Sequence, residues 1–249
     1  MHLLKVVKSA RKSRRRRLDL TPLVEEVTDR LITENGYAVI GISREIVRGL
    51  VLEIVEGIAS QMSTKPKSGP VYNRIKRNIH LFEKALTAKL AENVDGLTGD
   101  IIEFIITRNP ELSSRIAPLL YRKLVDLGRS DLIEILRDQW NNMHSEFYLY
   151  CPKCGFKSLS PDFKCVICGY NPSEEEVREF NKIDLLLKDF IDTLDAESLK
   201  RLLATGFFYY SNGIRVPDSP RKTGESMFFL SRRDRARIIS RLRELGENL

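Results

Sequence analysis

The chain has 249 residues, and its 41 lysines and arginines outnumber its 34 aspartates and glutamates, which gives a net charge of +7. Hydrophobic residues make up 42% of the chain, enough for a packed core, so a wholly disordered protein is excluded. A membrane-spanning helix needs about 18 or more consecutive apolar residues, and the longest stretch without a charge, 202–214, is shorter than that. We therefore expect a folded cytoplasmic protein that does not span a membrane.

The charge is concentrated at the two ends of the chain. Residues 1–17 hold eight basic and no acidic residues, and residues 215–243 hold nine basic against three acidic. The interval 18–214 holds 24 basic against 29 acidic residues, so an acidic body lies between two basic regions. A basic arm can neutralise phosphates and release their counterions, which favours binding to DNA or RNA without sequence preference. A solvated tail, or an arm that docks on an acidic protein surface, is the alternative.

Residues 18–146 show the patterns of a helical domain. Thr21 is expected to cap a first helix that has Pro22 at its first position and ends at Gly36. A second helix is predicted over 43–62, and a third over 71–93, where apolar residues recur at helical spacing. Shorter helices are predicted over 98–107, 110–127 and 130–146, and we expect Pro118 to bend or divide the middle one.

From residue 147 the pattern changes to short aromatic runs, glycines and cysteines, and helices return at 173–179, 182–194 and 196–204. The run 207–216 predicts a β-hairpin, in which Asn212 and Gly213 form a type I′ turn. Ser231 is expected to cap a last helix that ends near Leu245, with Asp234 completing a capping box. The fold class is therefore mainly α, with a small α+β region at residues 173–249.

All four cysteines lie in one short segment with the spacing C-x2-C-x10-C-x2-C, at Cys151, Cys154, Cys165 and Cys168. Each pair can wrap one side of a metal ion, and the glycine after the second cysteine lets the backbone turn. Four thiolates in a closed tetrahedron suit Zn²⁺. This motif is the strongest functional signal in the sequence.

The segments CPKCG (151–155) and CVICGY (165–170) resemble the paired knuckles of zinc ribbons and of rubredoxin-like modules. The resemblance covers residues 147–172 and implies a small β-ribbon with a bound metal. Zinc ribbons occur in transcription, replication, translation and RNA-processing proteins, whereas rubredoxin-like modules hold iron and transfer electrons. The implied domains are a basic arm (1–17), a helical domain (18–146), a zinc ribbon (147–172) and an α+β C-terminal domain (173–249).

The first interpretation of the cysteine module is structural: the metal stabilises a segment too poor in apolar residues to fold alone. Electron transfer is the alternative, because similar modules in rubrerythrins accompany a di-iron bundle with Glu-x-x-His motifs. Here none of the three histidines follows a glutamate by three residues, which argues against that alternative. Disulfides are disfavoured because the chain shows no secretory signal.

The last predicted helix has an apolar face and a row of arginines at i, i+4 spacing. Like charges at this spacing repel one another, which favours an anionic partner, although a solvated row is the other possibility. The aromatic run 207–210 either stacks on bases or packs in the core. The candidate nucleic-acid contacts in the two basic regions are Arg14, Arg15, Arg16, Arg17, Arg232, Arg233, Arg237 and Arg241.

No catalytic arrangement is recognisable, since all cysteines are assigned to the metal and neither a P-loop nor a dinucleotide-binding motif is present. We therefore expect a protein that is not an enzyme. The favoured function is a nucleic-acid-associated accessory factor in replication, transcription, repair or RNA metabolism, with protein partners bound by the acidic helical body. A protein–protein interaction scaffold and a rubredoxin-like electron-transfer protein are the alternatives. Having only two glutamines favours a thermophilic, archaeal origin.

Overall fold

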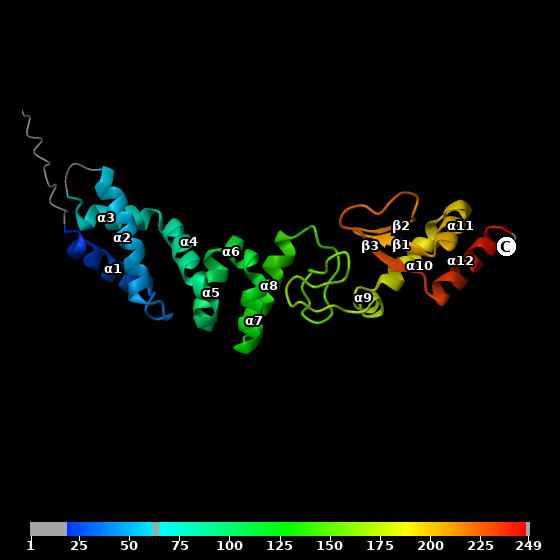
Figure 1. Cartoon of the computed structure of the whole chain (residues 1–249), viewed down its shortest axis with the longest axis horizontal. Coiled ribbons are helices and arrows are strands. Elements are labelled where there is room, and N and C mark those ends of the chain that lie inside the picture. The colour runs from blue at the N-terminus through cyan, green and yellow to red at the C-terminus, as the bar shows by residue number, and fades with distance from the viewer. Residues whose placement is uncertain (1–18, 62–64, 248–249) are drawn as a thin grey trace, which may run out of the picture. The chain divides into compact units, whose positions relative to one another are not determined.

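The computed structural model of the chain describes residues 19–61 and 65–247 (Figure 1). The fold is mainly α-helical with a small antiparallel sheet near the C-terminus, which confirms the predicted class. The described residues form two compact units, and the division between them falls between Lys89 and Leu90. The predicted boundaries near residues 146 and 172 stay predictions. The arginines of the basic arm, Arg14 to Arg17, lie outside the described residues.

The first unit consists of helices α1 (Thr21–Asn35), α2 (Arg44–Gln61), α3 (Ser68–Arg77) and most of α4 (Ile79–Leu90). The predicted cap at Thr21 was wrong, because Thr21 is the first residue of α1 and Leu20 occupies the cap position without a side-chain hydrogen bond. The helix ends at Gly36, whose φ of 66° suits glycine. It packs on α2 and α3 through buried aliphatic residues such as Val24 and Val51. A second part of the core is formed where the ring of Tyr37 stacks on that of Phe82, with 6.4 Å between centroids.

The prediction of one continuous helix over 71–93 was wrong, because the helix is interrupted at Asn78 and divided into α3 and α4. Asn78 has φ −118° and ψ 34°, and its side-chain amide donates to the carbonyl oxygen of Arg74 at 2.9 Å. Asparagine competes in this way with the helical hydrogen bonds of the backbone. The apolar spacing continues across the break from Ile75 to Phe82, and both are buried, so periodicity alone could not locate it.

In the second unit a 3₁₀ turn (Ala91–Gly96) precedes helices α5 (Gly99–Arg108), α6 (Pro110–Arg115), α7 (Ala117–Asp126) and α8 (Ser130–Met143). The predicted division of residues 110–127 at Pro118 is confirmed, because α7 starts one residue before this proline. Helix α8 packs on α5, α6 and α7. The core between these helices is built from aliphatic side chains, including the fully buried Ile102, Ile105, Leu120, Leu124 and Leu136.

The remainder of the second unit contains α9 (Glu174–Phe180), α10 (Ile183–Thr193), α11 (Ala196–Thr205) and α12 (Arg232–Glu244). The sheet consists of β1 (Phe207–Tyr210), β2 (Ile214–Arg215) and β3 (Ser226–Phe229), in the order β2-β1-β3. Ser231 caps α12 and forms the predicted capping box with Asp234. Phe208 is buried and stacks on Phe228, with 5.5 Å between ring centroids, so it packs in the core.

The hairpin was predicted correctly, but its type I′ turn was not. Tyr210 pairs with Ile214, so the loop contains three residues, 211–213. Asn212 would need a positive φ in a type I′ turn, and in the described part of the chain only Phe163 and Lys182 have one among residues other than glycine. The Asn-Gly pair therefore identified the hairpin but not its geometry.

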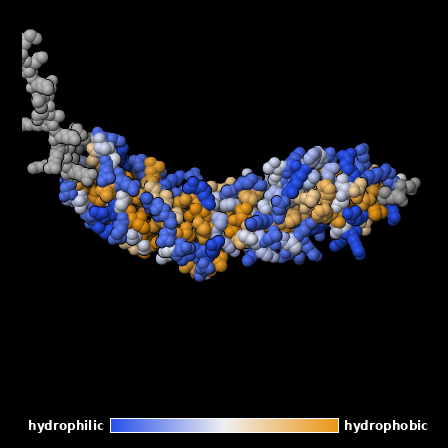
Figure 2. Space-filling model, viewed as in Figure 1, coloured by the Kyte–Doolittle hydropathy of each residue, from blue (hydrophilic) through white to orange (hydrophobic). Residues whose placement is uncertain are grey.

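The visible face in Figure 2 carries hydrophobic residues in patches between hydrophilic ones. Within residues 19–61 and 65–247, no helix combines the length and the apolar character that crossing a membrane would require.

Candidate metal centre

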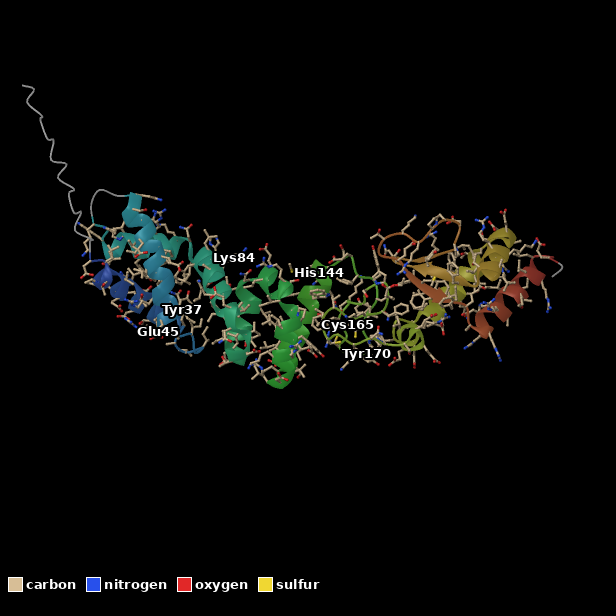
Figure 3. The ribbon with its side chains drawn as sticks, in the orientation of Figure 1. Tyr37, Glu45, Lys84, His144, Cys165 and Tyr170 are labelled. Atoms are coloured by element: carbon tan, nitrogen blue, oxygen red, sulfur yellow. The ribbon has the colours of Figure 1, made fainter. Side chains whose placement is uncertain are left out.

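The four cysteines converge in the irregular segment between α8 and α9, where Figure 3 labels Cys165. Their Sγ atoms all lie within 4.8 Å of one another. The distance between Sγ atoms is 3.7 Å for Cys151 and Cys168 and 3.6 Å for Cys154 and Cys165. Four bonds of about 2.3 Å to a tetrahedral Zn²⁺ would separate the sulfurs by about 3.8 Å, whereas a disulfide requires about 2.0 Å. All four are free thiols spaced to bind a metal.

Two backbone turns of the same geometry present the sulfurs. In each turn the first cysteine donates its amide to the carbonyl of the residue five positions later, at 2.8 Å in both cases. The glycine after the second cysteine donates to the carbonyl of the first, at 2.8 Å and 3.1 Å. These glycines, Gly155 and Gly169, have φ of 74° and 71°, which other residues rarely adopt. The repeated turn agrees with a zinc-ribbon-like module.

Short strand pairings join the turns, through the bridges between Tyr150 and Lys157 and between Leu159 and Cys165. Ser158 is fully buried, and its Oγ lies 3.2 Å from the Sγ of Cys165. Hydrogen bonds to this sulfur from the neighbouring thiols, and then from Ser158, hold the pKa of Cys165 below its ordinary value. Burial is the main cause that raises the pKa of Cys168, to about 11. A bound cation would favour the thiolate form of every ligand.

The donor set fits a closed structural site. It consists of four sulfur atoms with no oxygen or nitrogen ligand, and three of the four cysteines are buried. Catalytic zinc sites keep one position open for water or substrate, whereas structural sites use four protein ligands. No second group of metal-ligating side chains is found within residues 19–61 and 65–247. The described residues therefore give no support to a rubrerythrin-like di-iron site.

Side chains of α8 and of Asn181, the residue that follows α9, bind the module at its strand pairing. Trp140 of α8 donates its indole N–H to the carbonyl of Lys157 at 3.0 Å, and the side-chain oxygen of Asn141 accepts the amide of Lys157 at 2.8 Å. Across the pairing, Asn181 accepts the amide of Tyr150 at 2.7 Å and donates to its carbonyl at 2.9 Å. Both residues of the bridge between Tyr150 and Lys157 therefore form hydrogen bonds to side chains outside the module.

The module also contacts the sheet region. The ring of Phe163 packs on Phe228 of β3, with 5.0 Å between centroids. Arg221 forms an ion pair with Asp162 at 3.2 Å. These contacts and those of Trp140 connect the metal-binding segment to α8 and to β3, so it is an integral part of the second unit.

We expect Trp140→Phe to weaken this connection without removing a metal ligand. Phenylalanine keeps an aromatic ring but is smaller than tryptophan and has no N–H, so the partly buried carbonyl of Lys157 would lose its donor. The cost of an unsatisfied polar group is about 1–3 kcal/mol where it is buried. Urea unfolding followed by circular dichroism should show that loss. A Trp140→Phe chain with unchanged unfolding free energy would show that this hydrogen bond contributes little to the packing of α8 on the module.

The predicted arginine row of α12 is only partly free. Arg237 pairs with Asp192 of α10 at 3.1 Å, and Arg241 pairs with Glu244 at 2.9 Å. Arg241 also donates to the backbone carbonyl of Asp192 at 3.4 Å. Arg232 and Arg233, at the first turn of α12, are exposed and have no ion pair with the described residues. Of the four arginines predicted on α12, Arg237 and Arg241 therefore bind to other groups of the fold. Arg232 and Arg233 remain exposed to an external partner.

A cleft of about 200 Å³ lies between α10 and α12. Three cations line it, namely Lys188, Arg233 and Arg237, together with the carboxylates of Asp184 and Asp234. Both carboxylates are already bound by the buried side chain of Arg178, at 2.7 Å each. Because Arg237 pairs with Asp192, the lining cations that form no ion pair with a described residue are Lys188 and Arg233. Sequence reasoning missed Lys188, which lies far from α12 in the chain.

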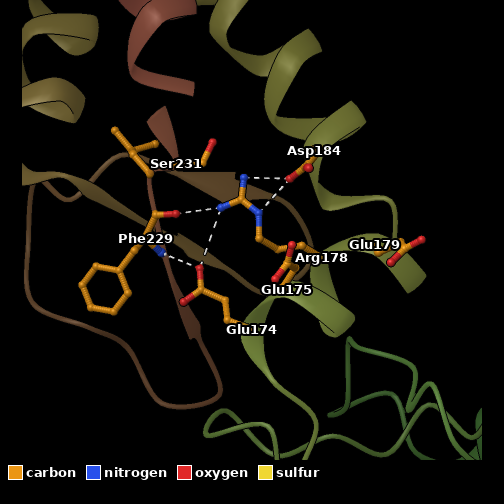
Figure 4. A pocket seen from close by; sticks show the side chains of 8 residues that line it. Glu174, Glu175, Arg178, Glu179, Asp184, Phe229 and Ser231 are labelled. Carbon is orange, nitrogen blue, oxygen red and sulfur yellow. Dashed lines mark hydrogen bonds and ion pairs between the residues drawn. The ribbon is translucent and has the colours of Figure 1, made fainter. Parts of the chain in front are cut away.

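Arg178 is the centre of a second, acidic cleft of about 550 Å³, drawn in Figure 4. Beside the arginine it is lined by carboxylates, Glu174, Glu175, Glu179 and Asp184. Glu174 accepts the amide of Phe229 at 2.8 Å, and burial is the main cause that raises the pKa of its carboxyl group. The two clefts meet at Asp184, so a negative surface adjoins the positive one.

A serine, a histidine and a glutamate also form a series of hydrogen bonds that the sequence did not indicate. Ser114 Oγ lies 2.6 Å from His144 Nε2, and His144 Nδ1 lies 2.6 Å from a carboxylate oxygen of Glu146. The hydrogen bond from His144 offsets burial and lowers the pKa of Glu146. The same sequence of groups occurs in hydrolytic triads, but Ser114 is only 3% exposed. Its separation of 30 positions from His144 explains why no motif revealed it.

The fold and the cysteine cluster define a mainly α-helical protein with a candidate structural metal centre. No family model matches the chain, and no curated protein or solved structure is similar to it at a significant level. The assignment of function therefore depends on the chemistry of the chain's own surfaces.

Proposed function

We propose that the protein is a nucleic-acid-associated accessory factor, in which a structural zinc ion stabilises the second unit and α12 contacts the phosphate backbone. The observation that carries the proposal is the cleft between α10 and α12, where Lys188 and Arg233 form no ion pair with a described residue and lie beside Arg237, which pairs with Asp192. Phosphate contacts by lysine and arginine supply most of the affinity in binding without sequence preference.

The exposed arginines extend this positive surface beyond the cleft. Arg232 and Arg233 lie at the N-terminal turn of α12, and Arg243 is exposed near its other end. The adjoining acidic cleft around Glu175 and Glu179 would repel phosphate, which favours a path for nucleic acid on the side of Lys188. The basic arm at Arg14 to Arg17 would add contacts that require no fixed geometry.

We propose that the role is not catalytic. The closed set of four sulfurs leaves no position for a substrate at the metal. The Ser114–His144–Glu146 chain connects α6 with the end of α8, and burial of Ser114 keeps its hydroxyl from an external substrate. His144 also stacks on Trp140 at 3.8 Å between ring centroids, as a packing contact would.

A protein–protein interaction scaffold is the second candidate, favoured by the pairing of Arg237 with Asp192. This ion pair shows that part of the basic helix is neutralised inside the fold. Under this alternative the remaining cations would bind carboxylates of a protein partner.

The two candidates are separated by fluorescence anisotropy of the full chain with labelled single-stranded DNA, duplex DNA and RNA. We expect binding at about 50 mM salt that weakens steeply as salt rises. Arg232→Glu combined with Arg233→Glu should weaken binding by about tenfold or more and lower the salt slope by about 2, since each phosphate contact contributes about 0.9. Deletion of residues 1–17 should weaken it further.

The matched control combines Arg115→Glu with Arg122→Glu. Both are exposed arginines of α6 and α7, so the control makes the same change in net charge away from the cleft. Absence of binding to all three nucleic acids at about 50 mM salt would exclude the proposal. An equal effect of the control would show that net charge rather than the α12 surface governs binding.

A further inference from the structure

The first unit has an open apolar groove that its own helices do not fill. Two hollows, of about 450 and 320 Å³, lie along α2 and α3, and Arg74 lines both. The larger hollow is floored by Ile54, Ile75 and Phe82 and is bounded by Leu81 of α4. Leu81 is 57% exposed, so its side chain adds accessible apolar surface at the edge of this hollow.

The lining residues repeat at one helical turn on each of the three helices. Ile54 and Ile58 are four residues apart on α2, and Leu81 and Ala85 are four residues apart on α4. Pro70 and Arg74 have the same spacing on α3, and Arg74 is exposed. A groove with this periodicity matches the apolar face of another helix, whose side chains recur at i, i+3, i+4 and i+7.

All charged side chains that line the groove are basic. Lys65, Lys67 and Arg74 line it, and no carboxylate among the described residues does so. None of the three cations forms an ion pair with a described residue. The chain's own arm, with eight basic and no acidic residues over 1–17, would be repelled by this rim. Charge complementarity therefore selects an acidic occupant rather than the basic arm.

We propose that this groove binds an acidic amphipathic helix of a partner protein, with its apolar face against Ile54, Ile75 and Leu81 and its carboxylates beside Arg74 and Lys67. The site lies in the first unit and depends on no property of the α10–α12 cleft. A factor of this kind would bind nucleic acid with one unit and a protein with the other.

The test uses the full chain and two fluorescein-labelled peptides of about 16 residues, roughly four helical turns. One peptide carries leucines at i, i+3, i+4 and i+7 among glutamates and alanines, and the other has the same composition in scrambled order. The first should bind about tenfold more tightly than the second, because only it can present an apolar face. Leu81→Ser and Arg74→Glu should each weaken its binding by about fivefold or more.

Matched controls are Val39→Ser, which changes an apolar residue with 88% exposure outside the groove, and Arg77→Glu, which makes the same charge change on α3 without lining the groove. Both should stay within about twofold of the unchanged chain. Circular dichroism checks folding, and Ala85→Glu, at an exposed position, replaces Arg74→Glu if that chain is unfolded.

Equal binding of the two peptides, no binding of either, or insensitivity to Leu81→Ser would each overturn the proposal. Sedimentation supplies one more outcome: a dimer that Leu81→Ser dissociates would identify a second copy of the chain as the occupant, and would likewise overturn it. Leu81→Ser should leave nucleic-acid binding unchanged, so this proposal and the phosphate-binding proposal fail separately.

Discussion

Replacement of Cys165 by serine is expected to release the metal and to unfold the segment between α8 and α9. A hydroxyl is a poor substitute for one of four thiolates, and structural zinc sites supply about 10–16 kcal/mol of apparent binding free energy at neutral pH. The segment has few apolar residues of its own, so the loss of the metal removes its main source of stability. The contacts of Lys157 with α8 and of Phe163 with β3 would then be lost as well.

Two measurements check this prediction. Mass spectrometry of the dialysed protein should find one zinc per unchanged chain and almost none per Cys165→Ser chain. Trypsin should cut the variant rapidly at Lys157 and Lys164, which lie within the segment. The control is Val166→Ser, which places a serine in the same C-x2-C turn at a residue with 41% exposure that offers no sulfur. Full metal content in Cys165→Ser would refute the four-ligand assignment, and iron in the unchanged chain would favour the electron-transfer alternative.

The cysteine cluster could be predicted because its information is local. Each C-x2-C-G turn closes through hydrogen bonds within six residues, so the spacing of Cys151 and Cys154 specifies most of the geometry. The contacts that hold the module in the fold are not local. Asn181 binds Tyr150 across 31 positions, and no sequence pattern distinguishes this asparagine from one on the surface.

The helices show the same division between local and non-local information. Caps and breakers were read correctly at Gly36, Pro118 and Ser231, where one residue decides the backbone conformation. Asn78 interrupts a helix through a bond from its own side chain, although its neighbours continue the apolar pattern. The arginine row of α12 was predicted to be exposed, because a helical projection shows only residues of the same helix. It could not include Asp192, which binds Arg237 across 45 positions.

Arg178 has the structural role that was hardest to predict from the sequence. Its side chain is buried and bonds to Asp184, Asp234 and the carbonyl of Phe229, each at 2.7 Å (Figure 4). Burial alone would lower the pKa of this guanidinium group, but the carboxylates of Asp234 and Asp184 outweigh that effect and raise it. One side chain thereby joins α9 to the start of α10, to the end of β3 and to the first turn of α12.

Arg178→Met is expected to destabilise the second unit by about 3–5 kcal/mol, because removal of one partner leaves a buried charge unpaired. The side chain of Asp234 is only 11% exposed, so its carboxylate would be the unpaired group, whereas that of Asp184 is 64% exposed and would remain hydrated. Urea unfolding monitored by circular dichroism gives the change in unfolding free energy. The control is Arg201→Met, which removes an exposed pair with Glu197 and should cost less than about 1 kcal/mol.

The added change Asp234→Asn shows how much of that loss comes from the unpaired carboxylate. Asparagine keeps an oxygen that can accept the amide of Ser231, as Asp234 does at 2.9 Å, but it carries no charge. The Arg178→Met, Asp234→Asn chain should therefore recover about half of the stability lost by Arg178→Met alone, since the desolvated charge is gone while the cap remains. No recovery would mean that the hydrogen bond of Arg178 to Phe229 and its packing contribute most, and that β3 rather than α12 depends on this arginine.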